Sequence, residues 1–216
     1  MALIFEDKVK ENKAAFLAKV VDVSKKLEID PNWLMAVMNS ESGLSSRIQN
    51  TSYPVGGGYA TGLIQFIPSS AKALGTTTEA LRNMSNVDQL DYVYKYFKPY
   101  KDKILSYIDL YMVTFFPVAV GKKDDYVLQT DTIPAAKIAT SNPVFDKNKD
   151  KQITVGEVKQ GFLSRIPVAL QVQFSKSFDT VGKFVGRNWI AITLTSASLI
   201  AITVLLFMNK NKIQNL

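Results

Sequence analysis

The stretch DPNWLMAVMNSESG, residues 30–43, decides how the N-terminal half of this chain is expected to fold. Asp30 can cap a helix that begins at Pro31, because a proline at the first helical position loses no helical hydrogen bond. The apolar face of this helix would comprise Trp33, Leu34, Val37 and Met38. Gly43 is suited to end it. The stretch therefore predicts a helix that holds Glu41 at its C-terminal end.

A second block, GLIQFIP, occupies residues 62–68. Gly62 allows the backbone to approach a ligand closely or to adopt a positive φ, and Gln65 offers an amide side chain. A helix that places one carboxyl group opposite such a turn suits protonation of a glycosidic oxygen in a cleft. The two blocks together indicate a site that cleaves sugars, centred on Glu41.

Apolar residues at helical spacing predict further helices before residue 120. One is expected from about Val9 to Leu27, a short one from Pro68 to near Gly75, and two more over 87–97 and 104–115. The polar, glycine-rich residues 49–60 are expected to form a flexible loop beside the site. Residues 121–145 are expected to be irregular. No long strand pattern occurs before residue 120.

Composition narrows the chemistry of the 216-residue chain, which has no histidine, no cysteine and a formal net charge of +7. Ser-His-Asp hydrolysis, cysteine-protease chemistry and structural zinc sites all lack their residues. Catalysis must then rest on carboxylates, hydroxyls, amides, lysines or an oxygen-bound metal, and we expect no cofactor for it. The positive charge favours an anionic partner such as a cell-wall polymer or an acidic lipid surface. No nucleic acid is expected as a partner, since no basic-aromatic or recognition-helix pattern occurs.

Residues 146–157, DKNKDKQITVGE, have the order of oxygen ligands of an EF-hand calcium loop. The expected ligands are the side chains of Asp146, Asn148, Asp150, Thr154 and Glu157, with Gln152 through its backbone carbonyl. Lys151 stands where the loop needs glycine, and Lys147 and Lys149 weaken the local negative charge, so a modest affinity is expected. We predict a structural Ca2+ that braces this segment; the alternative is a solvated lysine-rich turn.

The stretch from Trp189 to Met208 contains no charged residue and no proline. At about 1.5 Å per residue it can cross a hydrocarbon core of roughly 30 Å, which predicts one transmembrane helix. Lysine and arginine are nearly balanced on its two sides, so charge does not decide the orientation. Before it, residues 161–188 mix phenylalanine with basic residues, which fits either a helix on the membrane surface or a plain spacer helix.

The residues Glu41-Ser42-Gly43, followed by ATGLIQFIPSSAKALG at 60–75, resemble the lytic transglycosylase family, which is related to goose-type lysozyme. The resemblance covers roughly residues 15–118. It implies a lysozyme-like fold in which Glu41 protonates the glycosidic oxygen between muramic acid and glucosamine of peptidoglycan. It also implies that Gln65 lines the sugar cleft, with Gly62 beside it.

One block of that family is missing here. The place where the family has Ala-Tyr-Asn-Ala-Gly holds DLYMVTFFP at residues 109–117. Tyr111, or Tyr107 one turn earlier, is the candidate to supply a hydroxyl near Glu41 and the substrate.

The expected fold class is thus mainly α. The expected domains are a lysozyme-like transglycosylase domain (1–120), an extension with the calcium loop (121–160), an amphipathic linker (161–188), the transmembrane helix (189–208) and a polar tail (209–216).

No acidic residue lies between Glu41 and Glu79, and a lone acid suits attack by the substrate's own hydroxyl. Glu41, kept protonated by an apolar pocket, would first act as acid and then as base on the 6-hydroxyl of muramic acid, giving a 1,6-anhydro product. Lysozyme-type hydrolysis is the alternative reaction, with Asp88, Asp91 or Asp109 positioning a water. A membrane-anchored module that binds glycan without turnover is the non-enzymatic alternative.

The N-terminus does not resemble a secretory signal, so synthesis in the cytoplasm followed by membrane insertion is expected. This architecture is similar to membrane-anchored transglycosylases that some phages carry in an internal virion membrane. We therefore expect that location, with the lipid membrane and other virion membrane or capsid proteins as partners. A tail-anchored cellular enzyme in the host inner membrane is the alternative.

Overall fold

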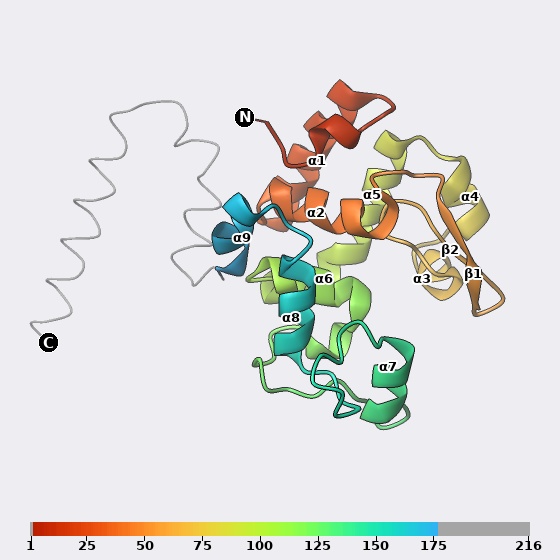
Figure 1. Cartoon of the computed structure of the whole chain (residues 1–216). Helices are drawn as coiled ribbons and strands as arrows, with labels where there is room; N and C mark the ends of the chain where they lie inside the picture. The colour runs from red at the N-terminus through yellow and green to blue at the C-terminus, as the bar shows by residue number, and fades with distance from the viewer. Residues whose placement is uncertain (1, 177–216) are drawn as a thin grey trace, which may run out of the picture.

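The computed structural model describes residues 2–176 of the chain (Figure 1). Nine α-helices, three short 3-10 helices and one β-hairpin make up this part. The mainly helical fold expected from the sequence is thereby confirmed for the described residues. The expected transmembrane helix at 189–208, linker residues 177–188 and the polar tail lie outside them. Within residues 2–176, no helix is both long and apolar enough to cross a membrane.

The first two long helices match the sequence pattern closely. The helix α1 (Lys13–Leu27) packs on α2 (Pro31–Ser42) and on α5 (Asn86–Phe97). It begins after Val9, which is buried beside the short 3-10 helix Glu6–Lys8. The face of α1 that packs on the core comprises Phe16, Val20, Val23 and Leu27. These apolar residues recur at helical spacing, so their burial against two neighbours explains why this segment is helical.

The predicted boundaries of α2 are confirmed. The Asp30 side chain accepts a hydrogen bond from the backbone N–H of Asn32 at 2.8 Å, which caps the helix before Pro31. At the other end Gly43 adopts a φ of +60°, and its N–H donates to the Asn39 carbonyl at 2.9 Å. The last turn of α2 therefore ends where the sequence predicts, with Glu41 in it.

Residues 49–61 differ from the expectation of a flexible loop. They form an antiparallel hairpin of β1 (Gln49–Val55) and β2 (Gly58–Thr61), in which Val55 lies opposite Gly58. Gly56 and Gly57 make the turn, and both have positive φ, as a two-residue hairpin turn requires. Polar residues dominate the strands, so the alternation of apolar and polar residues that normally indicates a strand is missing.

Beyond the hairpin, the helices α3 (Pro68–Ala73), α4 (Thr78–Asn83), α5 and α6 (Tyr107–Phe115) complete the region before residue 120. The helices α2 and α6 are in contact, and α3 and α4 pack against β2. This arrangement brings the C-terminal half of α2 to the middle of the molecule, between the hairpin and the later helices (Figure 1).

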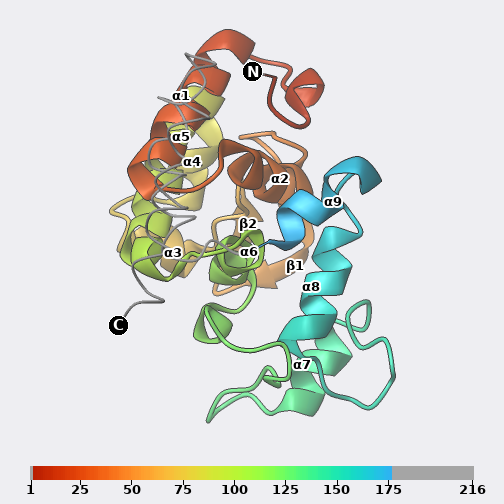
Figure 2. The ribbon, with the colours of Figure 1, turned by 90° about the vertical axis from the view of Figure 1, so that its left-hand side faces the viewer.

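The segment after residue 120 is more ordered than the sequence indicates. It contains α7 (Ala135–Ser141), α8 (Val155–Leu163) and α9 (Val168–Ser175), which lie along one side of the molecule in Figure 2. The expectation that 121–145 is irregular is therefore wrong at α7. The helix α9 packs on both α6 and α8. Aromatic rings of this segment pack against rings of α6; the rings are Tyr107, Tyr111, Phe115, Phe145, Phe162 and Phe174.

Candidate active site

Glu41 lies in the last turn of α2, where the fold surrounds it with protein atoms. Part of the residue is still accessible to solvent, but burial of the carboxyl group is sufficient to raise its pKa. Burial is the largest influence on this pKa, because a charged carboxylate is poorly solvated there. A carboxyl group with a raised pKa keeps its proton to higher pH than an exposed one, as a general acid requires.

Two side chains oppose this effect of burial. A hydrogen bond with Tyr111 of α6 lowers the pKa of Glu41, and the positive charge of Arg165 lowers it further. Arg165 follows α8, and its Nη1 donates to Ser40 Oγ at 2.7 Å and to the Tyr111 hydroxyl at 3.3 Å. The carboxyl group is therefore flanked by a hydroxyl and a guanidinium that both favour its charged form.

Three tyrosines share this environment. Burial raises the pKa of Tyr96 to about 12 and raises those of Tyr107 and Tyr111 further, with the negative charge of Glu41 as an additional cause for each. These phenols are therefore neutral hydrogen-bonding groups at physiological pH. Tyr96 donates to the Val113 carbonyl at 3.1 Å, whereas the buried hydroxyl of Tyr107 has no hydrogen-bond partner among the described residues.

The turn at Gly62 is tied to the end of α2. The hydroxyl of Ser42, the residue after Glu41, donates to the Leu63 carbonyl at 3.0 Å. Gln65 has a φ of +52°, and its side-chain amide donates to the Gly62 carbonyl at 3.1 Å. The structure thus places the Gly62 turn beside the C-terminal end of the Glu41 helix. The role of Gln65 in holding a sugar stays a prediction.

Gln89 is a structural residue of this turn that the sequence did not indicate. Its buried Oε1 accepts from the Leu63 N–H at 2.6 Å, and its Nε2 donates to the carbonyls of Ser46 and Leu81. Gly62 has a φ of +78°, and a β-carbon there would lie 2.8 Å from Gln89 Cδ. A buried glutamine on a helix has no local sequence signature, because only its tertiary partners give it this role.

The three aspartates considered as a second catalytic carboxylate bind other groups than Glu41. Asp88 accepts from Ser85 Oγ at the start of α5, and Asp91 pairs with Lys19 at 2.7 Å. Asp109 accepts from Ser106 Oγ and from the N–H groups of Leu105 and Gly121. Among the described residues, no second carboxylate contributes to the pKa of Glu41.

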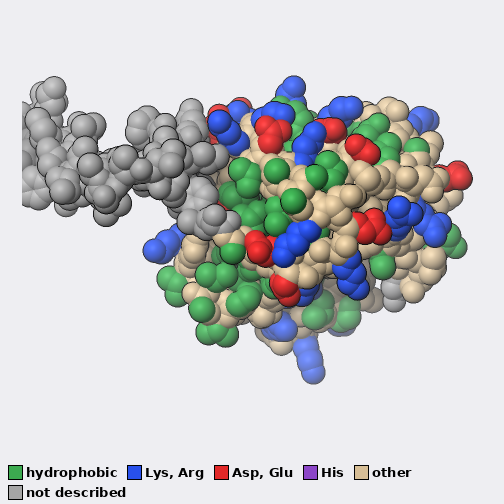
Figure 3. Space-filling view, turned by 90° about the horizontal axis from the view of Figure 1, so that it is seen from above, with side chains coloured by type: hydrophobic (Ala, Val, Ile, Leu, Met, Phe, Trp, Pro, Cys, Tyr) green, Lys and Arg blue, Asp and Glu red, His purple; other side chains and the backbone are tan. Residues whose placement is uncertain are grey.

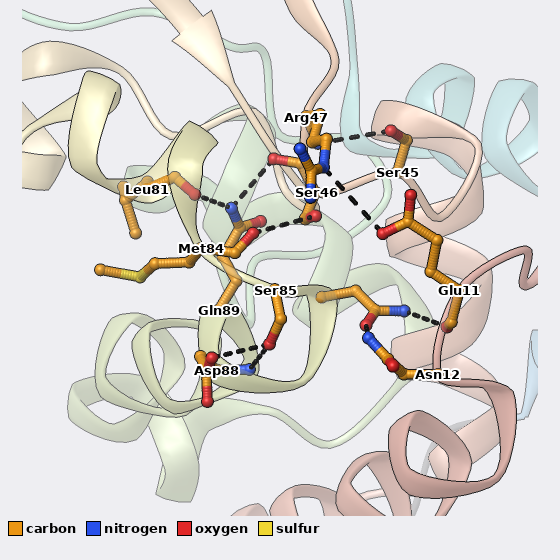
Figure 4. A network of polar contacts seen from close by, with 11 residues as sticks. Glu11, Asn12, Ser45, Ser46, Arg47, Leu81, Met84, Ser85, Asp88 and Gln89 are labelled. Atoms are coloured by element: carbon orange, nitrogen blue, oxygen red, sulfur yellow. Dashed lines mark hydrogen bonds and ion pairs between the residues drawn. The ribbon is translucent and has the colours of Figure 1, made fainter.

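A pocket of about 310 Å³ adjoins the end of α2. Ser42 lines it, as do Lys8 and Lys10, whereas Glu41 does not. Figure 4 shows part of the polar network around it, including the ion pair between Arg47 and Glu11 at 4.0 Å. Basic side chains outnumber acidic ones in this pocket. On the face seen in Figure 3, in contrast, basic and acidic side chains are intermixed.

The loop predicted to bind calcium, residues 146–157, follows α7 and runs into the first turn of α8. Its backbone is folded onto its own side chains: Asp146 Oδ2 accepts from the Lys151 N–H, and Asp150 Oδ1 accepts from the Gln152 N–H. Val127 forms a β-bridge with Thr154. The buried atoms Asp146 Oδ1 and Glu157 Oε1 have no hydrogen-bond partner in the part of the chain that the structure describes. Two orphaned carboxylate oxygens at the first and last positions fit a bound cation.

Other features of the loop fit a cation less well. Within residues 2–176 no three acidic side chains gather closely enough to form a metal centre. The backbone at Lys151 makes the turn with a φ of +65°, but a lysine is strained there where the loop needs glycine, and the side chains of Asn148 and Asp150 bond to each other at 3.0 Å. Glu157 Oε2 accepts from the Thr154 N–H, and Thr154 Oγ1 accepts from the Glu157 N–H, which forms a capping box for α8; Glu157 Oε2 also accepts from the Thr154 hydroxyl. Calcium binding stays a prediction.

One known domain family matches the part of the chain that contains Glu41 and the Gly62 turn. Residues 20–102 match the family model described as the Transglycosylase SLT domain. This segment includes Glu41 and the Gly62 turn, while Tyr111 and Arg165 lie beyond it. No curated protein and no solved structure matched the chain. Members of the matched family are lytic transglycosylases, so the match supports peptidoglycan cleavage at the level of the domain family.

Proposed function

We propose that this chain is a lytic transglycosylase that cleaves peptidoglycan with Glu41 as its general acid and base. The observation that supports this most strongly is the position of Glu41. It lies within the segment that matches the transglycosylase domain, and burial raises its pKa beside Tyr111 and Arg165. A carboxyl group whose pKa is raised by burial and lowered by two neighbours is suited both to give and to take a proton.

In the proposed mechanism, the protonated carboxyl of Glu41 donates its proton to the oxygen between muramic acid and glucosamine. The bond from this oxygen to the muramic acid breaks, and charge develops on the sugar. The carboxylate then accepts the proton of the muramic acid 6-hydroxyl, whose oxygen attacks the anomeric carbon. The product is a 1,6-anhydro sugar, and no water is consumed. Tyr111 and Arg165 would stabilise the carboxylate between the two proton transfers.

Within residues 2–176 no second carboxylate acts on Glu41, which favours this reaction over hydrolysis. Retaining and inverting glycosidases ordinarily use two carboxyl groups. Asp88, Asp91 and Asp109 each have a hydrogen-bond or ion-pair partner away from Glu41. A single acid that also serves as base needs a nucleophile from the substrate, and the 6-hydroxyl supplies one.

The experiment is to incubate the purified full chain with peptidoglycan and to analyse the released fragments by mass spectrometry. We expect anhydro-muramic ends, which lack one water relative to reducing ends. Reducing ends would instead establish lysozyme-type hydrolysis. Bound but uncleaved glycan would establish a binding module and contradict the proposed enzyme.

We also propose that the loop at 146–157 binds Ca2+ as a structural ion with no part in the chemistry. The unpartnered buried oxygens of Asp146 and Glu157 support this proposal. A cation between them would offset the cost of burying two carboxylate oxygens without hydrogen bonds.

For location, we propose that residues 189–208 anchor the enzyme in the internal membrane of a virion. The support is the uncharged stretch itself and its similarity in arrangement to membrane-anchored virion transglycosylases. Immunoblotting of purified particles tests this proposal. A band in host membranes alone would favour a cellular tail-anchored enzyme.

A further inference from the structure

We propose that Arg165 is a positioning residue of the Glu41 site, supplied by the extension rather than by the segment that matches the transglycosylase domain. It would hold the Ser40 and Tyr111 side chains on either side of Glu41 and present the positive charge that stabilises the carboxylate after proton donation. This inference rests on the proposed function of Glu41. It adds that residues 121–176 complete the active site.

The first support is the pair of hydrogen bonds made by one guanidinium nitrogen. Nη1 of Arg165 donates to Ser40 Oγ at 2.7 Å and to the Tyr111 hydroxyl at 3.3 Å. Ser40 directly precedes Glu41 on α2, and the Tyr111 hydroxyl hydrogen-bonds Glu41 from α6. The guanidinium therefore links the two helices that surround the carboxyl group.

The second support is the packing that fixes Arg165. Its guanidinium lies over the rings of Phe162 and Phe145, with 5.2 and 5.8 Å from Cζ to the ring centroids. Phe162, on α8, stacks on Tyr111 with 3.5 Å between centroids and 10° between planes. Helix α8 thus sets the position of the Tyr111 ring and of the arginine that bonds its hydroxyl. Stacked rings hold a guanidinium in place more rigidly than a solvated surface does.

The third support is electrostatic. Two side chains act on the pKa of Glu41, Tyr111 from α6 and Arg165 from the segment after α8. The charge of Glu41 in turn raises the pKa values of Tyr96 from α5 and of Tyr107 and Tyr111 from α6. The three phenols are neutral at physiological pH, so Arg165 is the one charged group of this set. A nearby positive charge favours the carboxylate. It opposes burial, which favours the protonated acid.

These effects give Arg165 a specific task. Burial alone would make Glu41 hold its proton tightly and donate it poorly, because the carboxylate formed in the first proton transfer would be too unstable. The charge of Arg165 lowers the pKa of Glu41 and so reduces the cost of that charged state. Catalysis by one residue in both steps needs this balance.

The test measures the titration of the Glu41 carboxyl in the full chain, independently of activity. Carboxyl-carbon NMR of ¹³C-glutamate-labelled protein follows this group, and its signal is assigned by its loss in Glu41→Gln. In Arg165→Met we expect the titration midpoint to move to higher pH than in the wild type. In Arg165→Lys, which keeps the charge, we expect the midpoint to stay near the wild-type value. Arg82→Met, an exposed arginine on α4, is the control and should change nothing.

A second readout is the pH profile of kcat/KM on peptidoglycan. Arg165→Met should move the alkaline limb to higher pH and lower kcat about tenfold or more, with little change in KM. Arg165→Lys should restore the position of the limb and part of kcat, since it cannot reproduce the planar guanidinium.

Several outcomes would overturn the inference. An unmoved Glu41 titration in folded Arg165→Met would show that the arginine does not act on the carboxyl group. Equal behaviour of the Met and Lys variants would show that packing alone matters. If Arg165→Met does not fold, a Glu41 midpoint in Arg165→Gln equal to that of the wild type overturns it as well. A wild-type chain that binds glycan without cleaving it refutes the proposed function, while the NMR result still decides the placement of Arg165.

Discussion

Glu41 is placed by the fold at a cost in stability. Its folded-state pKa is raised above the usual value of 4.5, chiefly by burial. Below pH 4.5 the carboxyl is protonated in both the folded and the unfolded chain. Above it the unfolded chain loses its proton first, so the free energy of unfolding falls as pH rises, until the folded carboxyl also ionises. The group that is suited to catalysis therefore destabilises the protein at neutral pH.

The first prediction follows from this linkage. Glu41→Gln should raise the melting temperature at pH 7, because a neutral amide replaces a group that resists ionisation. The gain should shrink as pH falls toward 4 and vanish there. Each 1 kcal/mol gained in the free energy of unfolding raises the melting temperature by roughly 2–4 °C for a chain of this size. Thermal denaturation followed by circular dichroism checks this, with exposed Glu79→Gln as the control. A gain that is independent of pH would contradict the linkage.

The second prediction concerns the hydroxyl of Tyr111. Tyr111→Phe removes a hydrogen bond that lowers the pKa of Glu41 but keeps the ring stacked on Phe162. The alkaline limb of the pH profile for kcat/KM should therefore move to higher pH. The control is Tyr92→Phe, which removes the hydroxyl of a partly exposed tyrosine on a different helix, α5, and should leave the pH profile unchanged. A limb displaced to lower pH would argue against the hydrogen bond.

At the scale of elements, the Gly62 turn and helix α5 form one unit. Gly62 donates its N–H to the Ile48 carbonyl at 2.9 Å and accepts from the Gln65 N–H through its own carbonyl. Gln89 fills the space where a side chain at position 62 would lie. The turn that follows the hairpin is thus held both by its own backbone and by a buried side chain from α5.

The third prediction separates backbone strain from this close packing. Gly62→Ala should destabilise the protein by roughly 2–4 kcal/mol, the sum of a positive-φ penalty and the displacement of Gln89 from its buried hydrogen bonds. Gly75→Ala has a similar φ of +75° with open space around the added carbon, and should cost only about 1–2 kcal/mol. Urea denaturation measures both. Equal losses in the free energy of unfolding for the two variants would show that Gln89 can move aside without a cost in stability.

The elements also show what sequence patterns can predict. Helix α2 combines a capping aspartate, a proline, a periodic apolar face and a terminal glycine, so its bounds are determined locally. The hairpin at 49–61 has polar strands, and its one clear signal was the pair Gly56-Gly57. The roles of Gln89 and Arg165 depend on partners distant in the chain, which no local pattern reveals. The catalytic role of Glu41 stays a prediction: its motif and its helix end coincide in the sequence, and the structure adds its burial and its hydrogen bond with Tyr111.

At the scale of the whole molecule, the segment after residue 120 packs directly on the catalytic region. Phe162 stacks on Tyr111, and Phe174 of α9 packs edge-on against Tyr107 at 5.0 Å. The matched segment at 20–102 therefore contains Glu41, the proposed proton donor, while residues outside it supply much of the surroundings of this side chain. Stabilising the extension should then stabilise the active site.

The fourth prediction tests the calcium loop as part of this larger unit. Adding Ca2+ to the full chain should raise its melting temperature, and a concentration of 100 times Kd corresponds to about 2.7 kcal/mol. Asp146→Ala should abolish the calcium-dependent rise, whereas exposed Asp131→Ala should retain it. A melting temperature that is the same with calcium and with chelator would show that the loop binds no calcium and only caps α8.

The most direct test of the central claim is the rate at which the full chain releases soluble fragments from purified peptidoglycan. We predict that Glu41→Gln lowers this rate by at least about 100-fold, as expected for loss of a general acid, while glycan binding persists. Glu79→Gln should match the wild type. A Glu41→Gln protein that releases fragments at close to the wild-type rate would contradict the account.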